Sequence, residues 1–332
     1  MLAAFFVISL ALSLMTYHEV KALAHAYSHN AFMFIFHTID FKVPPMQARF
    51  GTLDLYASWE PRLLSNLLGG WSTIACFNPF TGKVDANEFA WRVGVYAACW
   101  MLAICLLYMA ALRAAALLPI LGTYAGVAFG YMPNLTDRVC PWDMPALFFY
   151  TVFICLLIRR RLIWLLPLLP VAVLFKETAA LLPVAFLFGW GSRRRRIGLF
   201  ALGLALAGGA KLGANVWTHT AGYNPINLKL AATNLSFFMM GNFPHEDWYR
   251  IDWAFFNHPI FINAGFLVAF FIAARGRDPH VPMLRVLALL FIVLTLLCGV
   301  IFEYRIWFEL IPIGLYPFYG PALLASSCQK KS

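Results

Sequence analysis

Ten apolar segments, joined by short polar turns and two long polar loops, constrain this chain more than any other feature of its sequence. Of the 332 residues, 62% are hydrophobic and 12% are charged. Soluble domains carry about 45–50% apolar and about 25% charged residues, and about 20 apolar residues in a helix cross a bilayer. We therefore expect an all-α polytopic membrane protein, in which residues 1–332 form a single membrane domain. Its ten predicted helices lie at about 1–18, 91–112, 114–132, 144–158, 162–175, 179–190, 197–216, 259–274, 284–302 and 310–325.

The basic residues indicate how these helices are oriented. Arginines gather in three turns between apolar segments, at residues 159–161, 193–196 and 275–277. Short basic turns face the cytoplasm, so the N-terminus is expected inside. The net charge of +10 then reflects orientation and contact with anionic membrane lipid. A nucleic-acid partner is not expected.

The carboxylates fall on the opposite side of the predicted membrane. With this topology, fourteen of the fifteen Asp and Glu residues, all but Asp278, lie at outer helix ends or in outer loops. Two long outer segments carry many of them. Residues 20–90 are expected to form surface-lying amphipathic helices, and residues 217–257 to cap a site. Any chemistry is therefore predicted at the extracytoplasmic face.

Two of the predicted helices are too short to span hydrocarbon. The segments 162–175 and 179–190 hold about 14 and 12 residues, against the roughly 20 required. Lys176, Glu177 and Thr178 lie between them. Short paired segments with charge at their junction commonly line a polar cavity, although a pair that merely ends early beneath a loop is the structural alternative.

Three further groups of polar residues are candidates for the site. A carboxylate in the first outer loop can accept a proton from a hydroxyl, and a nearby arginine can bind an anion. Asp143 begins the fourth predicted helix, where a plain N-cap is the alternative. Glu309 lies four residues after Arg305, so the two can pair on one helical face. The candidates are Asp40, Asp54, Glu60 and Arg62 in the first loop, Asp143 at the helix start, and Glu303, Arg305 and Glu309 near the last helix pair.

The sequence shows no nucleotide-binding, zinc-protease or nucleophile-elbow motif. Its seven cysteines lack metal-ligand spacing, so no cofactor is expected and a divalent metal is not indicated. Acids combined with arginine and lysine indicate proton abstraction together with stabilisation of an anionic group such as phosphate.

Four short motifs resemble GT-C-type integral-membrane glycosyltransferases, and small bacterial members most closely. The resemblance covers about residues 35–325. It implies a polyprenyl-phosphate sugar donor, an acceptor hydroxyl on a glycan, lipid or protein, inversion at the sugar carbon, and a bacterial cytoplasmic (inner) membrane with the site facing the periplasm or the exterior. The motifs are an Asp after the first helix, Trp142-Asp143-x-Pro145, Lys176-Glu177-Thr178-Ala179 and Glu303-x-Arg305.

The same resemblance assigns roles to the candidate residues. The catalytic Asp of the family corresponds to Asp54 or Asp40, and the sequence does not choose between them. Where the family often has Asp-x-x-Tyr, this chain has Asp54-Leu55-Tyr56. We expect Arg305, Lys176 and Arg62 to bind the donor phosphate, and Glu177, Glu303, Asp143, Glu309 and Glu60 to orient these cations or bind sugar hydroxyls.

Two other functions fit part of the pattern. A transporter or flippase for a lipid-linked or anionic substrate would also need charges and short helices, but it would favour an internal repeat and charges at the bilayer midplane. Here no repeat is visible and the charges crowd one face, which favours the enzyme. A membrane acyltransferase would rest on residues 245–247, a His-Glu-Asp run.

The predicted topology can be tested with reporter fusions. We expect fusions after residues 70, 140 and 240 to report an external location, and fusions after residues 195 and 278 a cytoplasmic one, because the basic turns stay inside. A single reversed fusion at one of the basic turns would contradict the orientation.

Overall fold

The structure of the chain is a computed structural model. It describes residues 86–130, 143–189, 191–217, 278–298 and 307–329, the strand residues 77–78 and 83–84, and the single positions 7, 10, 64 and 232. The predicted segments 1–18 and 259–274 and the two outer loops lie almost wholly outside the described residues. So do six candidate site residues, namely Asp40, Asp54, Glu60, Arg62, Glu303 and Arg305.

The described part of the chain is helical, apart from one short antiparallel pair of strands, β1 and β2, that joins Phe77 to Val84. Eight of the predicted apolar segments form helices, so the helical architecture is confirmed. Ten membrane crossings remain a prediction. The elements are β1 (Phe77–Asn78), β2 (Lys83–Val84), α5 (Ala86–Leu112), η1 (Arg113–Ala116), α6 (Leu117–Gly130), α7 (Asp143–Ile158), η2 (Leu162–Trp164), α8 (Leu165–Phe175), η3 (Glu177–Phe188), α9 (Arg193–Trp217), α12 (Val281–Cys298) and α13 (Leu310–Gln329).

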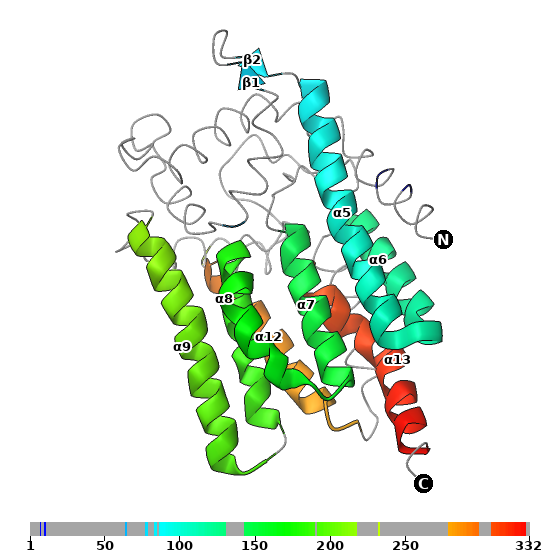
Figure 1. Cartoon of the computed structure of the whole chain (residues 1–332), viewed down its shortest axis with the longest axis vertical. Coiled ribbons are helices and arrows are strands. Elements are labelled where there is room, and N and C mark those ends of the chain that lie inside the picture. Colours follow the sequence, from blue (N-terminus) through cyan, green and yellow to red (C-terminus); the bar gives the residue numbers. More distant parts are fainter. Residues whose placement is uncertain are drawn as a thin grey trace.

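Two helical stretches are long and apolar enough to cross a membrane, Gly94–Val127 and Arg193–Val216. The first contains Arg113, whose φ of 54° lies in the left-handed region. There α5 ends and the chain turns back through η1 into α6, so the stretch forms a helical hairpin (Figure 1). The remaining apolar helices in the described ranges are shorter, which agrees with the predicted short pair around Lys176.

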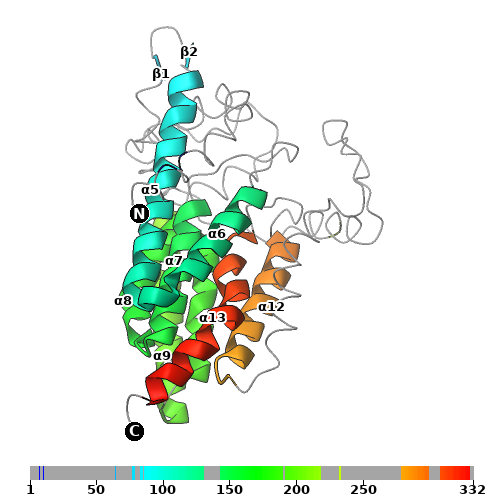
Figure 2. The same cartoon turned by 90° about the vertical axis from the view of Figure 1, so that its right-hand side faces the viewer.

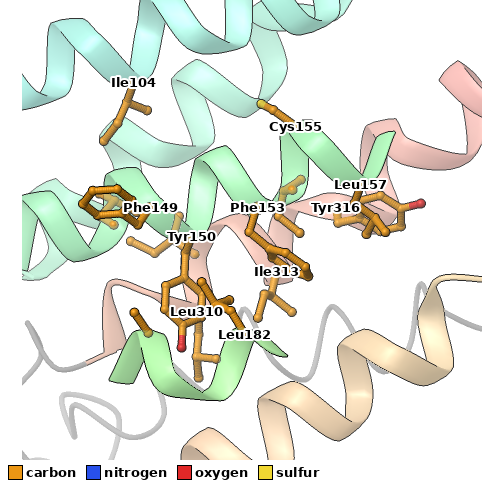
Figure 3. Packing of buried hydrophobic residues seen from close by; sticks show 14 of the residues in the cluster. Ile104, Phe149, Tyr150, Phe153, Cys155, Leu157, Leu182, Leu310, Ile313 and Tyr316 are labelled. Atoms are coloured by element: carbon orange, nitrogen blue, oxygen red, sulfur yellow. The ribbon is translucent and has the colours of Figure 1, made fainter. Parts of the chain in front are cut away.

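Helix α7 lies at the centre of the bundle. It packs against α5, α8, η3 and α13, while α9 covers α8 and η3, and α12 lies against η3 and α13 (Figures 1 and 2). Tyr150 and Phe153 of α7 belong to the same buried cluster as Leu310 and Ile313 of α13 (Figure 3). A buried apolar core therefore joins helices that are more than 150 residues apart in the sequence.

The charged residues are sorted to the two ends of this bundle. Helices α7 and α13 begin at the upper end in Figure 1, whereas α9 and α12 begin at the lower end. We call the upper end, where Asp143 begins α7, the carboxylate end. We call the lower end, which carries the turns 159–161 and 193–196, the arginine end.

At the arginine end, two arginine side chains cap helix C-termini by donating hydrogen bonds to backbone carbonyl groups there. Arg159 donates to the carbonyls of Ala111 and Ala110 at 2.9 and 2.6 Å, at the end of α5. Arg196 donates to Leu187 O at 3.1 Å, near the end of η3. The last carbonyls of a helix lack intrahelical donors, so these basic turns satisfy backbone groups as well as carrying charge.

Two glycines let α6 and α13 approach closely. A Cβ atom at Gly122 would lie 2.6 Å from Leu315 Cδ2, and one at Gly126 would lie 2.7 Å from Ile311 Cδ1. Small residues four apart are a common means of close helix packing in apolar surroundings, because backbone and side chain then meet directly.

We expect Gly122→Val to lower the thermal stability of the detergent-purified protein, because the new side chain overlaps Leu315. Overpacking of this kind costs about 1–3 kcal/mol. Gly208→Val on α9 is the matched control, since no described atom lies within 4 Å of the added Cβ. Equal melting temperatures of the two variants would contradict the tight α6–α13 contact.

Candidate functional site

Three charged residues from distant parts of the chain meet at the carboxylate end. Lys176 Nζ lies 2.7 Å from Glu309 Oε1 and 3.3 Å from Asp143 Oδ1. The side chain of Lys176 is 6% exposed, and both carboxylate side chains are 0% exposed. We call Asp143, Lys176 and Glu309 the buried ion cluster.

The backbone at Lys176 explains why its partners come from other helices. Lys176 separates α8 from η3 in an extended conformation, with φ −155° and ψ 131°. The Lys176 side chain contacts α7 and the residue that precedes α13. Glu177, the first residue of η3, pairs with Lys211 of α9, with Glu177 Oε2 3.8 Å from Lys211 Nζ. Asp143 and Glu309 are the carboxylates that contact Lys176 in the described structure, and the predicted role of Glu177 in orienting a cation or binding a sugar hydroxyl stays a prediction.

Two uncharged side chains connect the buried ion cluster to the surrounding helices. The Thr178 hydroxyl donates to Glu309 Oε1 at 3.0 Å, and the Tyr150 hydroxyl donates to the Thr178 carbonyl at 2.9 Å. Asp143 and Tyr150 both belong to α7, so the contacts run from α7 through η3 to the start of α13 and back. This closed ring fixes three elements relative to one another.

Aromatic side chains surround this ring. Tyr150 packs against Phe291 of α12 with ring centroids 6.2 Å apart, and Phe291 packs against Trp307 at 6.4 Å. Phe308, next to Glu309, is fully buried. Charge–charge attraction is stronger in such an apolar environment, but an uncompensated charge is also much more costly.

The structure thus brings together three of the ten predicted site residues, Asp143, Lys176 and Glu309. Glu309 was expected to pair with Arg305, which lies outside the described residues; the described partner is Lys176. Asp143 is the first residue of α7 and so has the position expected of a helix-capping acid, but its carboxylate also binds the buried lysine.

Sequence reasoning assigned no role to Thr178 or Tyr150. Tyr150 lies seven residues after Asp143, which places both on one face of α7 two turns apart, and this spacing was available as a signal. Thr178 lies two residues after Lys176, in the motif already noted. Nothing in the sequence indicated that its hydroxyl would bind Glu309.

A second polar contact lies at the arginine end. Asp278 accepts hydrogen bonds from the His280 backbone N–H at 2.8 Å and from the Tyr316 hydroxyl at 2.9 Å. Burial lowers the pKa of His280 below its ordinary value, although the negative charge of Asp278 opposes this. The contact joins the start of α12 to α13. Asp278, the one acid predicted on the inner side, therefore has a structural role there.

In the part of the chain that the structure describes, no three His, Cys, Asp or Glu side chains are grouped so that they could hold a metal ion. No protein-family model, curated protein or solved structure matches this chain.

We expect Lys176, between α8 and η3, and Lys211, on α9, to contribute differently to stability. We expect Lys176→Met to destabilise the protein by about 3–5 kcal/mol, because it leaves buried carboxylates without their cation. Lys211→Met is the matched control. Its pair with Glu177 is partly exposed, so we expect a loss of about 0–1 kcal/mol. Thermal unfolding in detergent measures both; equal losses would contradict the assignment.

Proposed function

We propose that this chain is an integral-membrane glycosyltransferase that moves a sugar from a polyprenyl-phosphate donor to an acceptor hydroxyl at the extracytoplasmic face. One observation supports this most. Residues from three regions picked out by the sequence motifs meet in one buried cluster, with Asp143 from Trp142-Asp143-x-Pro145, Lys176 from Lys176-Glu177-Thr178-Ala179, and Glu309 four residues after Arg305.

In the proposed reaction, a carboxylate of the first outer loop, Asp54 or Asp40, accepts the proton of the acceptor hydroxyl. The acceptor oxygen attacks the anomeric carbon, and the bond between that carbon and the donor phosphate breaks. Polyprenyl phosphate leaves with the bonding electrons, and the sugar carbon is inverted. Charge grows on the leaving phosphate, so a cation beside it stabilises the transition state.

The environment of Lys176 revises its part in this proposal. Its ammonium group is buried and already contacts two carboxylates, so it has little charge to offer a phosphate. We therefore assign phosphate binding to Arg305 and Arg62, since arginine grips phosphate in a bidentate manner. Lys176 remains a positioning residue at the base of the site.

The buried ion cluster would position the outer segments by fixing the helix ends that adjoin them. Glu309 follows residues 299–306, which include Glu303 and Arg305, and Asp143 follows residues 131–142. Holding these two chain positions on Lys176 limits where the preceding segments can lie. Accurate positioning of reacting groups supplies a large part of many enzymatic rate enhancements.

A transporter or flippase for a lipid-linked substrate is the second candidate. The observation that favours it is a lysine held between two carboxylates inside an apolar helix bundle, because ionisable groups at such depth often belong to substrate or ion pathways. In proteoliposomes, movement of the labelled donor between leaflets without sugar transfer would favour transport over the transferase.

The transferase proposal is tested with purified protein in nanodiscs, supplied with a polyprenyl-phosphate hexose or pentose and a hydroxyl acceptor. We expect release of polyprenyl phosphate. Asp54→Asn or Asp40→Asn should slow this release by about 10²–10⁴-fold, since that is the usual contribution of a general base. Glu88→Gln, which changes an acid in the first turn of α5, is the matched control. Full activity in both aspartate variants would contradict the assigned base.

A further inference from the structure

The two oxygens of the Glu309 carboxyl group have very different surroundings. Oε1 accepts a hydrogen bond from Thr178 Oγ1 at 3.0 Å and lies 2.7 Å from Lys176 Nζ. Oε2 is fully buried and has no hydrogen-bond partner within the described structure. A buried anionic oxygen without a donor loses its hydration and gains nothing in return, which is costly.

The charges around Glu309 add to this cost. One ammonium group, that of Lys176, contacts both Glu309 and Asp143. The ionisable groups that interact with the Glu309 carboxyl in the described part are Lys176, Asp143 and Tyr150. Tyr150 donates its hydroxyl hydrogen to the Thr178 carbonyl and so does not donate it to Glu309. Two carboxylates that share a site tend to retain a proton between them.

We propose that the buried ion cluster is a proton-binding site in which Glu309 carries the proton on Oε2, while Asp143 and Lys176 remain an ion pair. Protonation converts the carboxylate to a carboxylic acid, with the proton taken from solvent. Oε1 still accepts from Lys176 and Thr178, and the three side chains together become neutral. Glu309 rather than Asp143 is assigned the proton because Glu309 Oε2 is buried without a hydrogen-bond partner in the described structure, and no Asp143 oxygen there is so placed.

This inference goes beyond the proposed function, because it concerns the charge state of a buried group whatever the chain transfers. It also explains how two acids can be fully buried beside one lysine at the carboxylate end. In this arrangement, rising pH would remove the proton from Glu309 and weaken the ring that joins α7, η3 and α13.

Infrared spectroscopy tests the proton directly, with no substrate and no activity. In wild-type protein in detergent at neutral pH, we expect the carbonyl stretch of a protonated carboxylic acid, which is distinct from carboxylate bands. The band should disappear in Glu309→Gln and fade in the wild type at alkaline pH. In Asp143→Asn, Glu309 is the remaining anion beside Lys176, so it should ionise and the band should weaken. Its absence from the wild type, or its persistence in Glu309→Gln, would overturn the proposal.

Thermal unfolding provides a second readout from the same variants. Glutamine matches a protonated glutamate in size and charge, so Glu309→Gln should melt within a few degrees of the wild type at neutral pH. It should also lose the fall in melting temperature at alkaline pH. In Asp143→Asn, Glu309 must ionise to compensate Lys176 although its Oε2 has no donor in the described structure, so this variant should melt below both. A Glu309→Gln loss as large as that of Asp143→Asn would overturn the proposal. If neither variant folds, the wild-type infrared titration still decides.

Discussion

Burial of Lys176 between Asp143 and Glu309 is the interaction on which the arrangement of this bundle depends. Removing one partner from a buried ion pair commonly costs about 3–5 kcal/mol, whereas an apolar contact can be repacked more cheaply. The three side chains come from α7, from the junction of α8 and η3, and from the start of α13. These elements therefore cannot shift independently, and the surrounding aromatic core packs around a fixed polar point.

The opposite end of the bundle uses charge differently. Arg159 and Arg196 bind the final carbonyls of helices, and Asp278 joins α12 to α13 through Tyr316. The charges at the arginine end thus satisfy backbone groups and hold helix ends together. The carboxylate end holds the buried ion cluster, whose members come from or adjoin the sequence motifs. We therefore place the proposed site at that end.

Much of this fold could be predicted from the sequence, because continuous apolar runs mark the helices and the polar turns between them mark where helices end. The short segments around Lys176 were recognised from their length alone, since 12 to 14 residues cannot span hydrocarbon. The partners of Lys176 could not be predicted, because Asp143 and Glu309 are 33 and 133 residues away in the sequence and meet Lys176 only through the packing of the helices. The sequence therefore identified Asp143, Lys176 and Glu309 as candidates. It did not identify which of them pair, because the pairing depends on tertiary packing.

A double-mutant cycle between Lys176 and Asp143 tests most directly whether the buried ion cluster holds the bundle together. Lys176→Met leaves the buried carboxylates without their cation, and Asp143→Asn leaves Lys176 with Glu309 as its one described carboxylate partner, whereas the double variant removes both charges of the Lys176–Asp143 pair. We predict that the double variant unfolds with a smaller loss of stability than the sum of the single losses, with a coupling of about 0.5–3 kcal/mol. Additive losses would show that the two residues act independently and would contradict the cluster.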